Sequence, residues 1–362
     1  MEADCYAGID LGTMYTAVAG SNGVRQITPS EVGVPRDELV RRLLGKDLFF
    51  GSEIDAHRMA LTVHRPMELG RLKYGDLQCE SMPGAAAASL EAACWLLNHA
   101  MALLGFSQSA RVRCVMGVPA QASVVNRRAL MSIARSCTDS VVLVSEPFAV
   151  GFNLDCVTKR ALIVDIGAGT TDICHFYGAF PDAADQLTVG YGGDHVDRDF
   201  RERIVAEHPQ VQMSLTTARR IKEKSGFVGG ADQPVHVRLP VRQGAPQVFD
   251  LTDSLRACCS QLADRVVQGI LKVLEQIDSE GHAEVLENIV LSGGGGQLRG
   301  LDTYIETALQ EHGHVNVTRL FDSAFAGAQG ALQLARQLPE PMWLALQQEA
   351  GESTSDSSRK AA

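Results

Sequence analysis

The feature that most constrains this chain is a turn motif that occurs twice. An apolar run at residues 5–9 leads into Asp10-Leu11-Gly12-Thr13, and a second at 161–164 leads into Asp165-Ile166-Gly167-Ala168-Gly169-Thr170. A strand-like segment follows each copy, as expected for a β-hairpin whose turn is rich in Gly and Thr. The repeat therefore predicts two related lobes, each of which presents one such turn.

The rest of the chain alternates between helix-like and strand-like segments, which indicates an α/β fold. Helices are predicted at 85–104, 123–137, 215–225, 254–277, 298–309 and 323–338, and strands at 112–118, 141–144, 235–239, 247–251 and 288–291. The predicted division is a first lobe at 1–150, a second lobe at 151–320, a helix at 321–340 that returns to the first lobe, and a disordered tail at 341–362.

Each lobe also contains a segment that departs from this alternation. Residues 28–84 hold four prolines and mixed polarity, and residues 190–252 are largely polar, with the helix at 215–225 as the one helix expected there. Both segments are interpreted as inserted subdomains.

Composition excludes several classes of protein. With 362 residues, 45% of them hydrophobic, the chain is long enough for two cores. Its formal charge of -10 argues against direct nucleic-acid binding, because neutralising phosphates needs a surplus of Lys and Arg. The nine scattered cysteines suggest neither a disulfide framework nor a metal site. No leader or long apolar segment is visible, so a cytoplasmic protein without membrane insertion is expected.

The repeated turns are suited to holding phosphate. A turn that leaves a buried strand can aim successive N–H groups at an anion, and Gly12, Gly167 and Gly169 permit close approach. Asp10 and Asp165 would supply hard oxygen ligands to the hydration shell of Mg²⁺, and Thr13, Thr170 and Thr171 would add hydroxyl donors. A single turn of this kind is more often a plain hairpin, because Gly and Asp favour turns for local reasons, but two copies together with the further motifs favour the phosphate site. The chain contains neither G-x-x-x-x-G-K-[S/T] nor a G-x-G-x-x-G after the first strand.

Two further segments carry candidate functional groups. Glu146 follows an apolar strand and precedes Pro147, so it could orient a water molecule or simply complement the start of a helix. The glycine run Gly293, Gly294 and Gly295 lies between a strand and a helix, where it could pack against a flat adenine ring or form a flexible loop.

Together these motifs resemble, in order along the chain, the first phosphate motif, the first connecting motif, the second phosphate motif and the adenosine motif of the actin, Hsp70 and sugar-kinase superfamily. Residues 220–224 resemble the actin helix that lines the adenosine pocket, which implicates Lys222 and Glu223. Gly192 and Gly193 resemble the glycine pair near the terminal phosphate. Residues 115–126, 144–151, 163–174 and 190–197 are most similar to the magnetosome-associated bacterial actins of the MamK family, with a resemblance that extends from about residue 8 to residue 338.

This resemblance implies an actin-like ATPase fold with two pseudo-symmetric, RNase H-like lobes. ATP would bind between the lobes and be hydrolysed to ADP and phosphate, with Mg²⁺ held through water by Asp10 and Asp165. Glu146 would orient the attacking water with help from Asn126, a position where actin and the rod-shape bacterial actins carry Gln or Glu.

The implied function is assembly into cytoplasmic filaments that position magnetosomes, with further copies of the chain and magnetosome-associated proteins as partners. The alternatives are a plasmid-segregating or cell-shape actin, a metabolite kinase, and an Hsp70-like ATPase.

Overall fold

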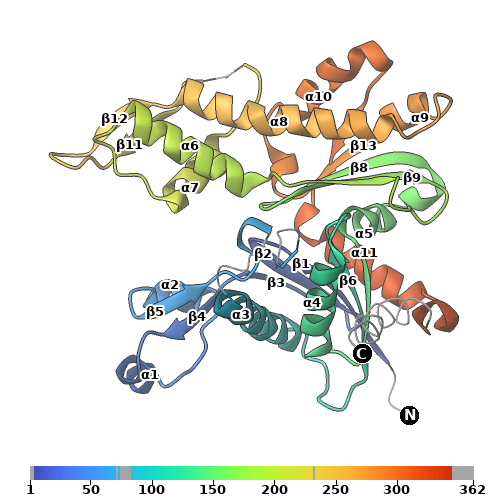
Figure 1. Ribbon diagram of the computed structural model, residues 1–362, viewed down its shortest axis with the longest axis horizontal. Helices are drawn as coiled ribbons and strands as arrows, with labels where there is room; N and C mark the ends of the chain where they lie inside the picture. Colours follow the sequence, from blue (N-terminus) through green and yellow to red (C-terminus); the bar gives the residue numbers. More distant parts are fainter. Residues whose placement is uncertain (1–3, 71, 74–82, 231–232, 345–362) are drawn as a thin grey trace, which may run out of the picture. The chain divides into compact units, whose positions relative to one another are not determined.

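The computed structural model describes residues 4–70, 72–73, 83–230 and 233–344. The chain forms two compact units, each with its own sheet and core (Figure 1). Unit 1 comprises the described residues of Met1–Cys156 and Asp322–Ala362, and unit 2 comprises those of Val157–Phe321. The chain thus leaves unit 1 once, builds unit 2, and returns.

Unit 1 is organised around a five-stranded sheet with the order β3-β2-β1-β6-β7, in which β1, β2 and β3 are antiparallel and β6 and β7 run parallel to β1. These strands are β1 Cys5–Leu11, β2 Tyr15–Gly20, β3 Arg25–Pro29, β6 Val112–Val118 and β7 Ser140–Ser145. The segment predicted as an insertion contains a two-stranded ribbon and short helices, namely β4 Val32–Pro35, α1 Glu38–Leu44, α2 Ser52–His57, β5 Leu61–His64 and the 3₁₀ turn Glu68–Gly70.

The alternation of residues along β1 separates the two faces of this sheet. Ala7, Ile9 and Leu11 are buried in a core with residues of α3 (Pro83–Ala102) and α4 (Val124–Arg135). On the opposite face lie α5 (Glu146–Asn153) and α11 (Ser323–Gln337) (Figure 1).

Helix α11 approaches the sheet and α5 through residues without bulky side chains. A Cβ built on Gly8 would lie 1.9 Å from the Ala328 carbonyl oxygen, and one on Gly330 would lie 1.7 Å from the Ala149 carbonyl oxygen. Backbone therefore fills the space that a side chain would need, on both sides of the helix.

Replacing Gly330 by alanine is expected to lower the free energy of unfolding of unit 1 by about 1–3 kcal/mol, because α11 must move away from α5. Both tryptophans, Trp95 and Trp343, lie in unit 1, so their fluorescence during urea unfolding reports on this unit. Gln333→Ala, on the exposed side of the same helix, is the control and should change stability by no more than about 0.5 kcal/mol. Equal stability of both variants would contradict the close packing.

Unit 2 repeats the strand order of unit 1. Its sheet has the order β10-β9-β8-β13-β14, with an antiparallel meander followed by two parallel strands. The strands are β8 Arg160–Ile166, β9 Thr171–Tyr177, β10 Gln186–Val189, β13 Ile289–Ser292 and β14 Val317–Arg319. Asp10 and Asp165 each occupy the sixth position of the first, seven-residue strand. The repeated turn motif therefore follows equivalent strands.

The remaining elements of unit 2 surround a large apolar core. They are α6 Gly193–Glu207, α7 Leu215–Ser225, the ribbon β11 His236–Leu239 with β12 Gln247–Asp250, α8 Thr252–Leu274, α9 His282–Leu286 and α10 Leu301–Leu309. The long α8 packs against α6, α10, β9 and β10 (Figure 1). Short 3₁₀ turns occur at Cys156–Thr158, Gly295–Gln297 and Gln310–His312.

The expectation of one helix within 190–252 is wrong, because the structure places both α6 and α7 there. Helix α6 buries Val196, Phe200 and Ile204, which are spaced four residues apart. The intervening residues are mostly Asp, Arg and Glu, so one narrow apolar stripe was hidden in a polar sequence.

The predicted disordered tail also begins too early. Residues 340–344 are helical, and Trp343 is only 2% exposed. The Arg113 guanidinium lies 5.9 Å from the centre of the Trp343 ring and pairs with Glu340 and Asp4. A short amphipathic segment with one large aromatic anchor is therefore packed on unit 1, and the remainder of the predicted tail, 345–362, lies outside the described residues.

None of the helices in the described part of the chain combines the length and apolarity required to span a bilayer.

Candidate functional site

The turn after β1 is held in shape by residues that the sequence analysis did not select. A Cβ on Gly12 would lie 2.4 Å from the Tyr15 carbonyl oxygen, so glycine is required for this turn. The Ser30 hydroxyl donates to the Gly12 carbonyl at 2.7 Å, and the Ser30 N–H donates to the Met14 carbonyl at 2.8 Å. Thr13, which stands between Gly12 and Met14 in the sequence, is half-buried. Ser30 thus supports the predicted phosphate turn from the segment that follows β3.

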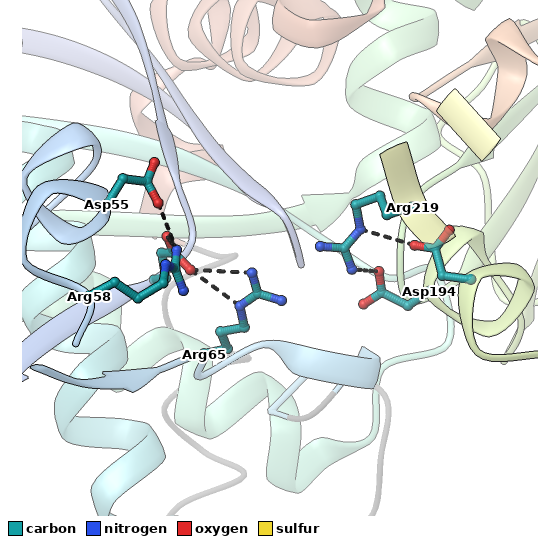
Figure 2. A network of polar contacts seen from close by, with 7 residues as sticks. Asp55, Arg58, Arg65, Asp194 and Arg219 are labelled. Carbon is teal, nitrogen blue, oxygen red and sulfur yellow. Dashed lines mark hydrogen bonds and ion pairs between the residues drawn. The ribbon is translucent and has the colours of Figure 1, made fainter. Parts of the chain in front are cut away.

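The residue after Ser30 is the centre of a charged cluster in the insertion. Glu31, 6% exposed, pairs with Arg58 at 3.2 Å and with Arg65 at 3.3 Å. Arg58 also pairs with Asp55 at 2.9 Å, as Figure 2 shows. Two arginines on one buried carboxylate fix the chain next to the support of the turn.

Glu146 lies at the start of α5, where the sequence placed it. The Ser145 hydroxyl caps this helix by accepting from the Phe148 N–H at 3.3 Å. The Glu146 side chain is buried and forms an ion pair with the ammonium of Lys73, which is also buried. Lys73 was not predicted because its segment showed no regular pattern.

The Asp10 carboxyl, in the same unit, is affected by burial and by the charges of Glu146 and Lys73. The pKa of this carboxyl is raised from its ordinary value to about 7, first by burial and then by the Glu146 carboxylate, while Lys73 acts in the opposite direction. Asn126 is buried in the first turn of α4, which Ser123 caps at 3.2 Å. The structure therefore electrostatically couples Asp10 to Glu146, and it places Asn126 within the same unit.

The turn after β8 is docked on the start of α6. The Gly193 N–H donates to the Gly167 carbonyl at 3.0 Å, and the Asp194 N–H donates to the Ala168 carbonyl at 2.8 Å. A Cβ on Gly192 would lie 2.6 Å from the Gly167 carbonyl oxygen. The second phosphate motif and the glycine pair, predicted separately, are thus brought together.

The threonine of this turn is engaged by a neighbouring acid. Gly169 and Thr170 are buried, and the Thr170 hydroxyl donates to the Asp172 carboxylate at 2.8 Å. Thr188 donates to the other oxygen of Asp172 at 2.5 Å. To donate to a phosphate, Thr170 would have to exchange this hydrogen bond.

The glycine run meets the end of β8. Asp165 lies beside Ser292 in the sheet, and a Cβ on Gly293 would lie 2.4 Å from the Ile166 carbonyl oxygen and 2.8 Å from an Asp165 carboxylate oxygen. A Cβ on Gly295 would lie 2.2 Å from the Ile166 side chain, whereas one on Gly294 would meet nothing within 4 Å. Two of the three glycines are therefore required by the packing of the protein itself, and Gly294 faces open space.

Lys222 and Arg219 connect α7 to the start of α6. The Lys222 ammonium donates to the Gly193 carbonyl at 2.7 Å and pairs with Asp197 at 2.8 Å. Arg219 pairs with Asp197 at 3.0 Å and with Asp194 at 2.8 Å, and Figure 2 shows its guanidinium directed toward Asp194. Glu223, predicted beside Lys222, is exposed.

The burial of this network affects the pKa values of Asp197 and Arg219. Burial raises the pKa of the Asp197 carboxyl, although Lys222 and Arg219 both act to lower it. Burial alone would lower the pKa of Arg219, but Asp194 and Asp197 raise it overall. Two basic and two acidic side chains are therefore gathered at the start of α6, next to the Gly192–Gly193 backbone.

A histidine closes the first turn of α6. The Gly192 N–H donates to the Nδ1 atom of His195 at 3.1 Å, and the His195 ring stacks on Tyr191 at 4.9 Å. Since Nδ1 accepts this bond, it carries no proton. Burial, followed by the positive charge of Arg198, lowers the pKa of His195.

Replacing His195 by glutamine is expected to reduce the acid sensitivity of unit 2. Because the folded-state pKa is lowered, the stabilisation by neutral histidine is fully present above its ordinary pKa of about 6.5 and is lost as pH falls through the lowered value. Glutamine at this helix position can accept the same N–H without titrating. In urea unfolding followed by circular dichroism, the variant should match wild type near pH 8 and exceed it near pH 5.5, by about 1.4 kcal/mol per unit of pKa shift. Identical pH slopes would contradict the assignment.

The donor set fits a magnesium ion better than a transition metal. Within the described ranges no cluster of three or more His, Cys, Asp or Glu side chains could hold a metal ion. Asp10 offers one carboxylate in unit 1, and Asp165 offers one in unit 2. Mg²⁺ commonly keeps several waters and binds only one or two carboxylates together with substrate phosphates, so each residue has donor chemistry that suits this ion.

Comparison with known proteins assigns the chain to a family. The family model described as MreB/Mbl protein matches residues 4–339. The chain is 35% identical over 338 residues to the actin-like protein MamK of Paramagnetospirillum magneticum, covering 93% of this chain and 94% of that protein. A MamK double helical filament structure aligns with a TM-score of 0.85 at 34% identity, covering 93% of this chain and 100% of that one. A non-polymerising MamK mutant bound to AMPPNP aligns with a TM-score of 0.69 at the same identity and coverage.

These matches confirm the predicted α/β fold of the actin type, in agreement with the repeated strand order of the two units. They also confirm the resemblance that the ordered motifs indicated. The chain belongs to the MreB/Mbl family of bacterial actins and, within it, to the actin-like proteins of the MamK type.

Proposed function

We propose that this bacterial actin binds ATP with Mg²⁺, hydrolyses it, and assembles into cytoplasmic filaments that position magnetosomes. The observation that carries the proposal is the repeated turn, with Asp10 and Asp165 at the same position of equivalent strands in two units of equal topology. The MamK filament and the AMPPNP-bound MamK mutant, each 34% identical to this chain, support assembly and nucleotide binding respectively.

Each unit would contribute its own groups to the nucleotide. Gly12 and Thr13 would present the first turn to the phosphates, and Gly167, Gly169 and Thr170 would present the second. The start of α6 at Gly192 and Gly193 would add the positive end of a long helix dipole, where negative charge is favoured. Its first N–H groups already donate to His195, Gly167 and Ala168, so this contribution would be electrostatic. Lys222, Glu223 and the run Gly293, Gly294 and Gly295 would bind the adenosine. Among these glycines, Gly294 has room for a ligand next to its backbone.

Hydrolysis would depend on positioning and electrostatics. Glu146 would orient the attacking water and accept its proton, and Asn126 would act as a second polar contact to that water. Asp10 and Asp165 would hold Mg²⁺ through its water shell. When bound, Mg²⁺ supplies positive charge to the phosphate oxygens as negative charge shifts toward the leaving group.

Filament formation would follow from repetition of one contact between copies of this chain. ATP would favour the polymer, and hydrolysis would weaken it, if the nucleotide state changes the conformation of the subunit. Magnetosome-associated proteins would then connect the filament to its cargo.

The test is sedimentation of the purified chain with ATP, with ADP and without nucleotide, in parallel with phosphate release. Wild type should pellet with ATP and release phosphate. Glu146→Gln should pellet equally, while its phosphate release falls by about 10²–10⁴-fold. Failure to pellet under every nucleotide condition, with turnover only after a metabolite is added, would instead identify a kinase of the same fold.

A further inference from the structure

We infer that Lys73 is a positioning residue for hydrolysis, which holds the Glu146 carboxylate in the orientation needed to direct water at the terminal phosphate. This inference rests on the proposed ATPase function. It concerns a residue that lies outside every motif described in the sequence and that belongs to the inserted segment of unit 1.

The first support is the geometry of the pair. The Lys73 ammonium is in direct contact with the Oε1 atom of Glu146, and the side chains are 5% and 9% exposed. A buried ion pair is weak evidence for a gain in stability, because desolvating both charges offsets their attraction. Its more specific effect is to fix the orientation of the Glu146 carboxylate through the Oε1 atom.

The second support is the backbone just before Lys73. Leu72 has a φ of 63°, in the left-handed region that leucine rarely adopts, and it is completely buried in the core of unit 1. The Lys73 N–H donates to the Gly70 carbonyl at 3.0 Å. A strained residue is retained only where the surroundings over-determine it, and such residues concentrate at functional sites. Here the residue with this backbone conformation is buried in the core, and the residue directly after it contacts Glu146.

The third support is the consequence of losing the ammonium from a buried site. Lys73 and Glu146 are both largely removed from solvent, so bulk water cannot replace the lost contact. Removing Lys73 would leave Glu146 without its partner and free to turn toward other donors, so water would be oriented less well even with nucleotide bound.

The experiment compares phosphate release during a single turnover by wild type, Lys73→Met, Lys73→Arg, Glu146→Gln and the double variant Lys73→Met/Glu146→Gln. Affinity for a fluorescent ATP analogue and thermal unfolding are measured on the same preparations. We expect Lys73→Met to lower phosphate release per bound ATP by about 10²-fold, with ATP affinity changed less than about threefold. Lys73→Arg, which keeps the charge, should restore at least a tenth of the rate. The double variant should be no slower than Glu146→Gln alone, because both changes remove one function.

The matched control is Lys46→Met. Lys46 pairs with Glu53 at 2.5 Å in the same insertion, but both side chains are about half exposed, at 55% and 44%. This variant should release phosphate at the wild-type rate. If Lys73→Met folds and also releases phosphate within threefold of wild type, the inference is overturned.

A second outcome would also overturn the inference. If the double variant releases phosphate much more slowly than Glu146→Gln alone, Lys73 and Glu146 act independently of each other. Should Lys73→Met fail to fold, the double variant, which removes both buried charges, and Lys73→Arg still decide the question. Absence of hydrolysis by wild type would refute the proposed ATPase itself, which is distinguishable from hydrolysis that does not depend on Lys73.

Discussion

Replacing Asp197 by asparagine is expected to lower the free energy of unfolding of unit 2 by about 3–5 kcal/mol. Asp197 is 1% exposed and is shared by Arg219 at 3.0 Å and Lys222 at 2.8 Å. Asparagine preserves the shape of the side chain and removes its charge. Two cations would then remain partly buried, with Asp194 as the nearby acid that still pairs with Arg219.

The same substitution should weaken nucleotide binding, since the Lys222 ammonium also holds the Gly193 carbonyl at the start of α6. Hydrogen–deuterium exchange should accelerate in α6 and α7 specifically. Asp253→Asn is the control, because Asp253 pairs with Arg256 at 3.0 Å on the surface with 89% of its side chain exposed. That change should cost no more than about 0.5 kcal/mol. Similar effects of the two substitutions would show that the buried network does not stabilise unit 2.

Replacing Trp343 by alanine should lower the free energy of unfolding of unit 1 by about 3–5 kcal/mol. The indole is 2% exposed and lies against the Arg113 guanidinium, which itself pairs with Glu340. Removing the ring leaves a cavity and exposes the arginine. The change therefore removes both the apolar burial and one contact of the cation.

The measurement is urea unfolding followed by the fluorescence of Trp95, which remains in α3 of the same unit. Leu344→Ala provides the comparison, because Leu344 is the next residue and is 54% exposed. It should change stability by less than about 1 kcal/mol. If Trp343→Ala is as mild as Leu344→Ala, the segment 340–344 does not contribute to the stability of unit 1.

The sequence predicted those elements whose pattern is strong and local. The strand at 112–118 and the helix at 215–225 agree with β6 and α7 residue for residue. Helix α6 was missed because its apolar residues are separated by charges. The short helix with Trp343 was missed because Pro339 and Pro341, which commonly mark the end of a helix, stand at its start, and its packing against Arg113 is not visible in the local sequence.

The candidate site shows the same limit. Asp10, Glu146 and Asp165 could be selected because each lies at or directly after the end of a strand within a recognisable motif. Lys73 and Ser30 could not, since Lys73 pairs with a residue 73 positions away and Ser30 supports a turn 18 positions earlier. Groups that orient others through space leave little trace in local sequence. The roles of all these residues in catalysis remain predictions.

The repeated strand order has a consequence for how this protein can change over time. Two copies of one scaffold place Asp10 and Asp165 at matching positions, each in a sheet that belongs to its own unit. The two units also have separate apolar cores. Substitutions in one half of the gene therefore act on a core that the other half does not share, so each copy of the scaffold can diverge around its own aspartate while the core of the other stays intact.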